Sequence, residues 1–145
     1  MRVYVDLCAL KRPFDAPGKD RVMVEALAVA SLVRAFEQGR LEMVASAVLE
    51  FENGNNPDRE RRETVAEILG RMRTLVKADN LVVARARQLE KQGLRPLDAL
   101  HVASAERVQC RYFVTCDDGL LRAGTRLASY LKTRIVNPLE LVNTL

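Results

Sequence analysis

The sequence is poor in the residues that build disulfide frameworks, zinc sites and aromatic binding platforms. Among 145 residues there are three cysteines, one histidine and no tryptophan, and aromatic residues make up 5%. An odd cysteine count, without a CxxC pair or clustered histidines, excludes a disulfide framework and indicates no zinc site. The scarcity of aromatic residues leaves no visible stacking platform for bases. A reducing cytoplasm fits this composition best.

Long hydrophobic runs are also missing. No apolar run approaches the roughly 20 residues that span a bilayer, so membrane insertion is not indicated. In the opening MRVYVDLCALKR the charge lies inside a short apolar run, so export is not indicated either. The chain is 48% hydrophobic and 29% charged, which is enough to bury one core, and we expect a single domain over residues 1–145. Lys and Arg number 23 against 19 Asp and Glu, which tilts the surface toward polyanions.

Short apolar runs alternate with segments of helical periodicity. The runs read as strands lie at 2–5, 41–45, 112–115 and 134–136. The segments read as helices lie at 20–38, from Ser46, after Pro57 to about Lys77, at 81–92, from Pro96 and after Pro138. Most connections are too long for hairpins, so we predict an α/β fold: a three-layer α/β/α arrangement with a central parallel sheet of four or five strands.

Four acidic residues stand out by their positions relative to these elements. Asp6 ends the first strand, Asp117 follows the third by two residues, and Glu52 lies on the helix that leaves the second. Asp98 lies in the first turn of its helix, where unpaired amides favour a carboxylate. Ligand sites of parallel sheets lie outside the carboxyl ends of the strands, so we expect these side chains to converge there.

Converging carboxylates repel one another strongly unless something positive is bound between them. Oxygen ligands without thiolate or imidazole clusters select hard ions, here Mg²⁺ or Mn²⁺, which keep several waters and bridge to phosphates. Such an ion activates water and stabilises charge on a phosphate. The pattern therefore indicates hydrolysis of phosphodiester bonds.

Each acid taken singly also has an ordinary structural role. Asp6 can cap a helix, and Asp98 can complement a helix dipole. Asp117 with Asp118 and Gly119 is a common turn sequence. We expect Asp118 to cap the residues that follow it. The combination favours a site, because Asp6 follows a buried run and Asp98 interrupts the apolar stretch LDALHVA.

Glu50 competes with Glu52 for the second position. Val48 and Leu49 share a helical face with Glu52, whereas Glu50 points roughly 160 degrees away from it. We therefore place Glu52 inward and Glu50 outward.

Four motifs in order resemble the PIN-domain nucleases, which include the VapC-type toxins of bacterial toxin–antitoxin pairs. They are VYVDLCAL, ASAVLEFE, PLDALHVASA and FVTCDD, and the likeness covers nearly the whole chain. The resemblance implies that Asp6, Glu52, Asp98 and Asp117 are catalytic carboxylates that hold the metal. It also implies a central parallel sheet, frequent homodimers and, for toxin members, an antitoxin partner.

Four further residues are assigned to the site's surroundings. Thr115 matches the family threonine, which the resemblance places near the carboxylates. His101 falls one helical turn after Asp98 and is a candidate supporting donor, although the favoured interpretation is a half-buried helix residue. Lys11 and Arg12 stand beside the expected site and are candidate phosphate contacts.

Two functions of different classes follow, with a third interpretation ranked last. The first is a Mg²⁺- or Mn²⁺-dependent ribonuclease acting on RNA. The second is a catalytically inactive PIN-like scaffold that binds RNA or a partner protein, because a fold does not guarantee activity. The third, a structural protein with accidental acids, leaves Asp98 in its apolar helix unexplained.

Overall fold

A four-stranded parallel sheet forms the centre of the computed structural model, which describes residues 1–16 and 18–145. The strands stand in the order β2-β1-β5-β6, with bounds Glu42–Met43, Arg2–Val5, Tyr112–Val114 and Arg134–Val136. Every pair in this sheet is parallel. The predicted parallel sheet is confirmed.

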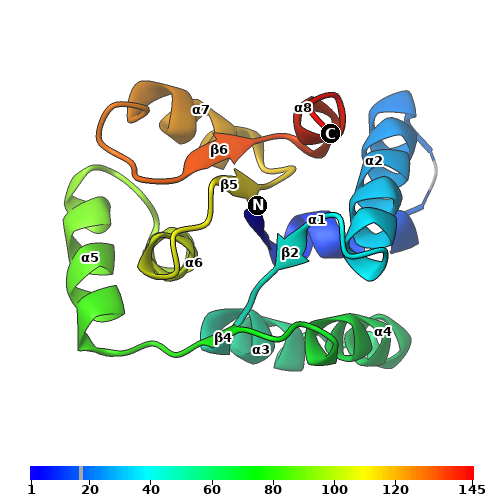
Figure 1. Ribbon diagram of the computed structural model, residues 1–145, viewed down its shortest axis with the longest axis horizontal. Helices are drawn as coiled ribbons and strands as arrows, with labels where there is room; N and C mark the ends of the chain where they lie inside the picture. Colours follow the sequence, from blue (N-terminus) through cyan, green and yellow to red (C-terminus); the bar gives the residue numbers. More distant parts are fainter. Residues whose placement is uncertain (17) are drawn as a thin grey trace.

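Helices lie on both sides of this sheet (Figure 1). On one side are α5 (Asn80–Lys91) and α6 (Pro96–Arg107), and on the other are α1 (Leu7–Lys11), α2 (Asp20–Glu37) and α8 (Pro138–Val142). The 3₁₀ turn η1 (Arg12–Phe14) follows α1, and α7 (Asp118–Arg126) precedes β6. The predicted three-layer α/β/α class is therefore confirmed.

A second, two-stranded sheet corrects two of the predicted boundaries. The expected strand 41–45 is divided: Val44 N–H still bonds the Val3 carbonyl (3.2 Å), but Ala45 N–H bonds the Thr74 carbonyl (2.9 Å). The chain thus changes partner, and β3 (Ala45–Ser46) pairs with β4 (Leu75–Val76). The helix expected to reach Lys77 ends at Gly70, a poor helix former, as α4 (Arg59–Gly70), which packs on α3 (Ala47–Gly54).

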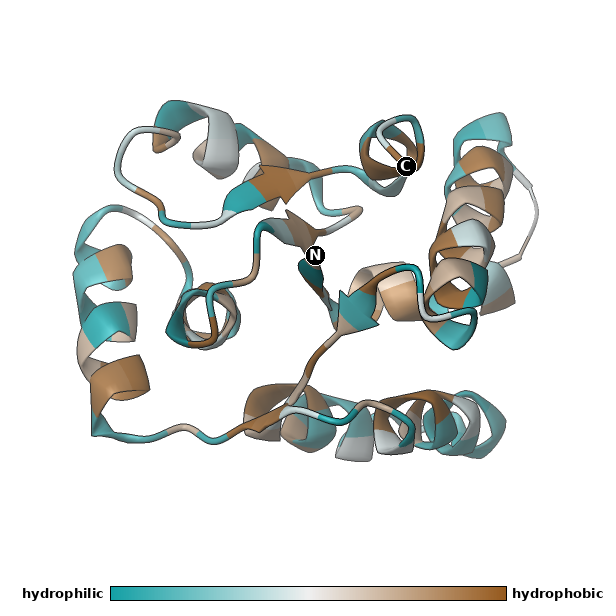
Figure 2. Cartoon of the chain, in the orientation of Figure 1, coloured by the Kyte–Doolittle hydropathy of each residue, from teal (hydrophilic) through white to brown (hydrophobic). Residues whose placement is uncertain are grey.

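The core sits between the sheet and its helices. Tyr4 and Phe113 stack across β1 and β5, with ring centroids 5.0 Å apart, and both side chains are fully buried. β1 and β5 are covered on both faces, which explains why their sequences are apolar without alternation. Hydrophobic segments gather on the strands and on the inward sides of the helices (Figure 2).

Side-chain caps begin many of the helices. Ser46 Oγ accepts the Leu49 N–H (3.0 Å) and so caps α3, the helix expected from Ser46. Asp117, rather than the expected Asp118, caps α7, because its Oδ1 accepts the Leu120 N–H (3.2 Å). Asp118 lies one residue further into the helix and pairs with Arg21 instead. Neither α1 nor α7 was predicted from the sequence.

No helix in the described part of the chain is long and apolar enough to cross a membrane.

Gly124 provides a test of how tightly α7 packs on β6. A Cβ added there would lie 2.7 Å from Ile135 Cβ, an atom fixed to the backbone of β6. We expect Gly124→Ala to destabilise the fold by about 1–3 kcal/mol, because overpacking outweighs the gain of up to about 1 kcal/mol in helix propensity. Urea unfolding measures the change.

The matched control is Gly70→Ala at the end of α4, where an added Cβ meets nothing within 4 Å. This variant should be as stable as the wild type or slightly more stable. Equal unfolding free energies for the two variants would contradict the described packing of α7.

Candidate active site

Asp6 marks the carboxyl end of β1 and is held in place by backbone bonds on both sides. Its N–H donates to the Val114 carbonyl of β5 (3.0 Å), and its Oδ1 caps α1 by accepting the Ala9 N–H (3.1 Å). The Cys8 thiol donates to the same oxygen at 3.0 Å. Burial raises the pKa of Asp6 well above its usual value, because the charged form loses water.

Asp117 stands beside Asp6, two residues beyond the end of the neighbouring strand β5. Its N–H donates to Thr115 Oγ1 (3.1 Å), and Thr115 is fully buried. The Thr115 hydroxyl also opposes the rise in the Asp6 pKa by hydrogen bonding, and it lies 3.5 Å from the Cys8 thiol. Thr115 therefore lies beside both aspartates, and its supporting role stays a prediction.

Asp98 joins Asp117 through an arginine that the sequence interpretation did not assign. Arg95 Nε lies 3.5 Å from Asp98 Oδ2, and Arg95 Nη2 lies 3.5 Å from Asp117 Oδ2. Burial raises the pKa of Asp98, the Arg95 charge opposes the rise, and the Asp117 charge adds to it. The guanidinium thus stands where two carboxylates face one another.

Glu52 faces inward and Glu50 outward, as predicted from the helical period. Glu52 is half-buried, with Oε1 3.4 Å from the Nε2 of buried His101, whereas Glu50 is exposed. The Glu52 charge acts on Asp98 and adds to the rise in its pKa. Two helices, α3 and α6, thus bring Glu52, His101 and Asp98 to the same edge of the sheet.

The four carboxylates are neighbours, but their side chains do not close around one point. Within residues 1–16 and 18–145, no three Asp, Glu, His or Cys side chains form a group able to hold a metal ion. The donor set nevertheless fits Mg²⁺ or Mn²⁺, because these ions keep several waters and need few protein oxygens. Arg95 between Asp98 and Asp117 marks a position where positive charge is favourable.

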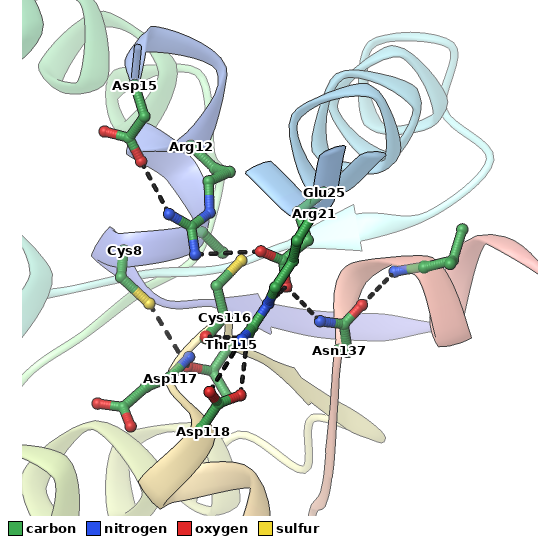
Figure 3. A network of polar contacts seen from close by, with 12 residues as sticks. Cys8, Arg12, Asp15, Arg21, Glu25, Thr115, Cys116, Asp117, Asp118 and Asn137 are labelled. Carbon is green, nitrogen blue, oxygen red and sulfur yellow. Dashed lines mark hydrogen bonds and ion pairs between the residues drawn. The ribbon is translucent and has the colours of Figure 1, made fainter. Parts of the chain in front are cut away.

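Arg12 is engaged in a separate network beside this edge (Figure 3). Its guanidinium pairs with Asp15 (3.1 Å) and with the buried Glu25 (3.0 Å), and Glu25 also accepts a 2.6 Å bond from Asn137. These contacts tie η1, α2 and the start of α8 together. Lys11 and Arg12 were expected to contact phosphate. Arg12 is held by the carboxylates of Asp15 and Glu25. Lys11 is half-buried and is the last residue of α1.

Arg21 extends this network to the loop that carries Asp117. Its guanidinium donates to Asp118 Oδ1 (2.7 Å) and to the Cys116 carbonyl (3.2 Å). Residues on both sides of Asp117 are therefore anchored to α2, which limits the positions that the Asp117 carboxylate can take.

Sequence reasoning missed the roles of Arg95 and Cys8. Arg95 lies three residues before Asp98 and next to Pro96, which places it one helical turn from that carboxylate. This spacing was the signal that could have indicated its contact with Asp98. Nothing in the sequence indicated that the Cys8 thiol would donate to Asp6, because that contact depends on α1, which was not predicted.

The raised pKa of Asp6 makes the stability of the fold depend on pH. The folded state holds the Asp6 proton more tightly than the unfolded chain, so its contribution to stability is lost as the pH rises above the usual aspartate pKa of about 3.9. Metal-free Asp6→Asn keeps a good helix cap and should gain stability relative to the wild type between pH 5 and pH 8. Denaturant unfolding at both pH values measures the difference.

Asp58→Asn is the control, because it exchanges one good N-cap for another at an exposed position. Its difference from the wild type should vary less with pH than that of Asp6→Asn. A pH-independent difference for Asp6→Asn would show that the carboxylate is well solvated.

Comparisons with known proteins agree with this geometry. The sequence matches the PIN domain family over residues 9–125, a range that contains Glu52, Asp98 and Asp117 and begins just after Asp6. A comparison with curated proteins found no match.

Among solved structures, the chain is similar to one in the crystal structure of VapBC2 from Rickettsia felis bound to a DNA fragment from their promoter. The TM-score is 0.61 at 10% sequence identity, over 94% of this chain and 98% of that chain. This likeness supports the fold. Together with the family match over most of the sequence, it leads to the conclusion that the chain belongs to the PIN domain family, a family of nucleases that generally use divalent metal ions.

Proposed function

We propose that the chain is a Mg²⁺- or Mn²⁺-dependent endoribonuclease whose metal ligands and catalytic carboxylates are Asp6, Glu52, Asp98 and Asp117. The observation that carries the proposal is the position of Arg95, whose guanidinium lies 3.5 Å from both Asp98 and Asp117. Two carboxylates that face a common cation at the carboxyl edge of a parallel sheet offer a place for a divalent ion. Family membership supports the same reaction class.

The residues around the carboxylates keep them in a state suited to this role. Asp6 and Asp117 each cap a helix through Oδ1, so their orientation is fixed before any ligand binds. Thr115 is buried, its Oγ1 accepts the Asp117 N–H, and its hydroxyl opposes the rise in the Asp6 pKa, so it lies beside both aspartates. A divalent ion held here would activate water and stabilise negative charge on the phosphate.

Positive side chains near the carboxylates would bind the RNA backbone. Arg95 is mostly exposed and reaches the carboxylates, so it can turn from them to a phosphate when a metal replaces it. Lys11 and Arg12 are further candidates where α1 ends and η1 begins, although Arg12 would first have to leave Asp15 or Glu25. The net charge of +4 favours a polyanionic substrate.

The likeness to a VapBC2 chain supports a role as the toxin of a toxin–antitoxin pair. We propose accordingly that the protein acts in the cytoplasm as a single domain and a homodimer, and that an antitoxin is its partner. Purification of the chain with the product of a neighbouring small gene tests this part of the proposal.

The alternative is a PIN-like scaffold that binds RNA or a protein without cutting. The separation of the four carboxylates favours it, because no three of them approach one point in the described residues. A protein that binds RNA but cleaves none at any Mg²⁺ or Mn²⁺ concentration would establish this alternative.

A pair of matched variants tests the catalytic assignment. Glu52→Gln should lower the metal-dependent cleavage of single-stranded RNA by at least about 100-fold, which corresponds to about 2.7 kcal/mol of lost transition-state stabilisation. Glu50→Gln, two residues away on the exposed face of α3, should cleave at the wild-type rate. Cleavage is measured on a labelled single-stranded RNA with Mg²⁺ or Mn²⁺. Equal losses in both variants, or a loss from Glu50→Gln alone, would contradict the assignment.

A further inference from the structure

The only histidine of the chain takes part in a buried series of polar contacts that begins at the cap of α3. Ser46 Oγ accepts the Leu49 N–H (3.0 Å) and lies 2.7 Å from the Tyr4 hydroxyl. The Tyr4 hydroxyl lies 2.6 Å from His101 Nδ1. Ser46, Tyr4 and His101 are at most 3% exposed, so water does not compete for these contacts.

The other ring nitrogen of His101 points at the proposed site. Nε2 is buried, has no hydrogen-bond partner within residues 1–16 and 18–145, and lies 3.4 Å from Glu52 Oε1. A buried polar atom without a hydrogen bond lowers the stability of the fold. The Glu52 carboxylate is the acceptor that Nε2 faces. The ring therefore stands between the core tyrosine and an acidic residue of the sheet edge.

The hydrogens of this series have one arrangement that gives each of them an acceptor. The Ser46 hydroxyl donates to Tyr4, and the Tyr4 hydroxyl donates to His101 Nδ1, which leaves the ring hydrogen on Nε2. With the hydrogen on Nδ1 instead, a lone pair on Nε2 would face the Glu52 carboxylate.

We propose that His101 is a positioning residue that donates its Nε2 hydrogen to Glu52, and that Tyr4 and Ser46 hold the ring in the tautomer that makes this bond possible. The effect on activity rests on the proposed function, whereas the bond itself does not. One oxygen of Glu52 is thereby held by the ring, which fixes the direction of the carboxylate. Ser46 takes part twice, because it also caps the helix that carries Glu52.

This arrangement resembles the general design of metal sites, in which a hydrogen-bonded partner orients each ligand. Loss of such an outer partner commonly lowers metal affinity or activity about 10- to 100-fold. The Tyr4 hydroxyl contacts His101 directly, and it also contacts Ser46, which caps α3. A conservative change at Tyr4 can therefore reach Glu52 by either contact, and the ring signals of His101 report the first of them.

Nitrogen NMR of the metal-free protein tests the bond directly, because a single histidine gives one unambiguous pair of ring signals. We expect a ring hydrogen on Nε2, with Nδ1 accepting from the Tyr4 hydroxyl. Tyr4→Phe should give a measurable Nδ1–H fraction, and Glu52→Gln should shift the Nε2 signal. The matched controls Tyr112→Phe, on the neighbouring strand, and Glu50→Gln should leave both signals unchanged. A wild-type ring without a hydrogen on Nε2 would overturn the proposal.

Binding of Mn²⁺ alone tests the positioning role. His101→Leu should weaken Mn²⁺ binding by about 10-fold or more. His101→Gln, which can present an amide N–H to Glu52, should restore most of the affinity. Equal losses in both variants, with folding unchanged by circular dichroism, would overturn the positioning role. A wild type that binds no Mn²⁺ would instead remove the proposed metal site, and the NMR result would still decide the bond.

Discussion

The carboxylates of Asp6 and Asp98 lie where burial disfavours their charged form. The neighbouring groups at this edge of the sheet are arranged to offset that cost. Both pKa values are raised by burial, and the charge of Asp117 raises that of Asp98 further. A folded chain that keeps such groups together loses stability unless donors or cations face them. Helix amides, the Thr115 hydroxyl and the Arg95 guanidinium supply part of this compensation.

The parallel sheet explains why these residues meet at all. β1 and β5 pair in register from Val3 with Tyr112 to Val5 with Val114, so the residues that follow both strands emerge at the same edge. Helices begin there at once, and the amides of their first turns donate to the Asp6 and Asp117 side chains, which cap the helices. Strand pairing thus positions the carboxylates, and capping orients them.

The apolar runs and the strand-to-helix connections were sufficient to predict the four strands of the sheet, the three layers and the inward face of Glu52. The divided strand at 41–45 was not predictable, because its second half pairs with Leu75–Val76, a partner distant in sequence. α1 and α7 are short, and each begins at an aspartate in a sequence that is also typical of a turn. Local sequence patterns therefore did not distinguish a helix from a turn at these positions. The contacts of Arg95 and of His101 depend on side-chain directions across elements, which spacing alone does not give.

The central claim is that the gathered carboxylates bind a divalent ion. Thermal unfolding of the metal-stripped protein with added Mg²⁺ or Mn²⁺ tests it, because an ion that binds only the folded state stabilises it by mass action. At a hundredfold excess over the dissociation constant the gain is about 2.7 kcal/mol, or several degrees in Tm. The wild type and the exposed-cap variant Asp58→Asn should show this rise, and Asp98→Asn should show little of it. An unchanged Tm of the wild type in millimolar Mg²⁺ and Mn²⁺ would contradict the account.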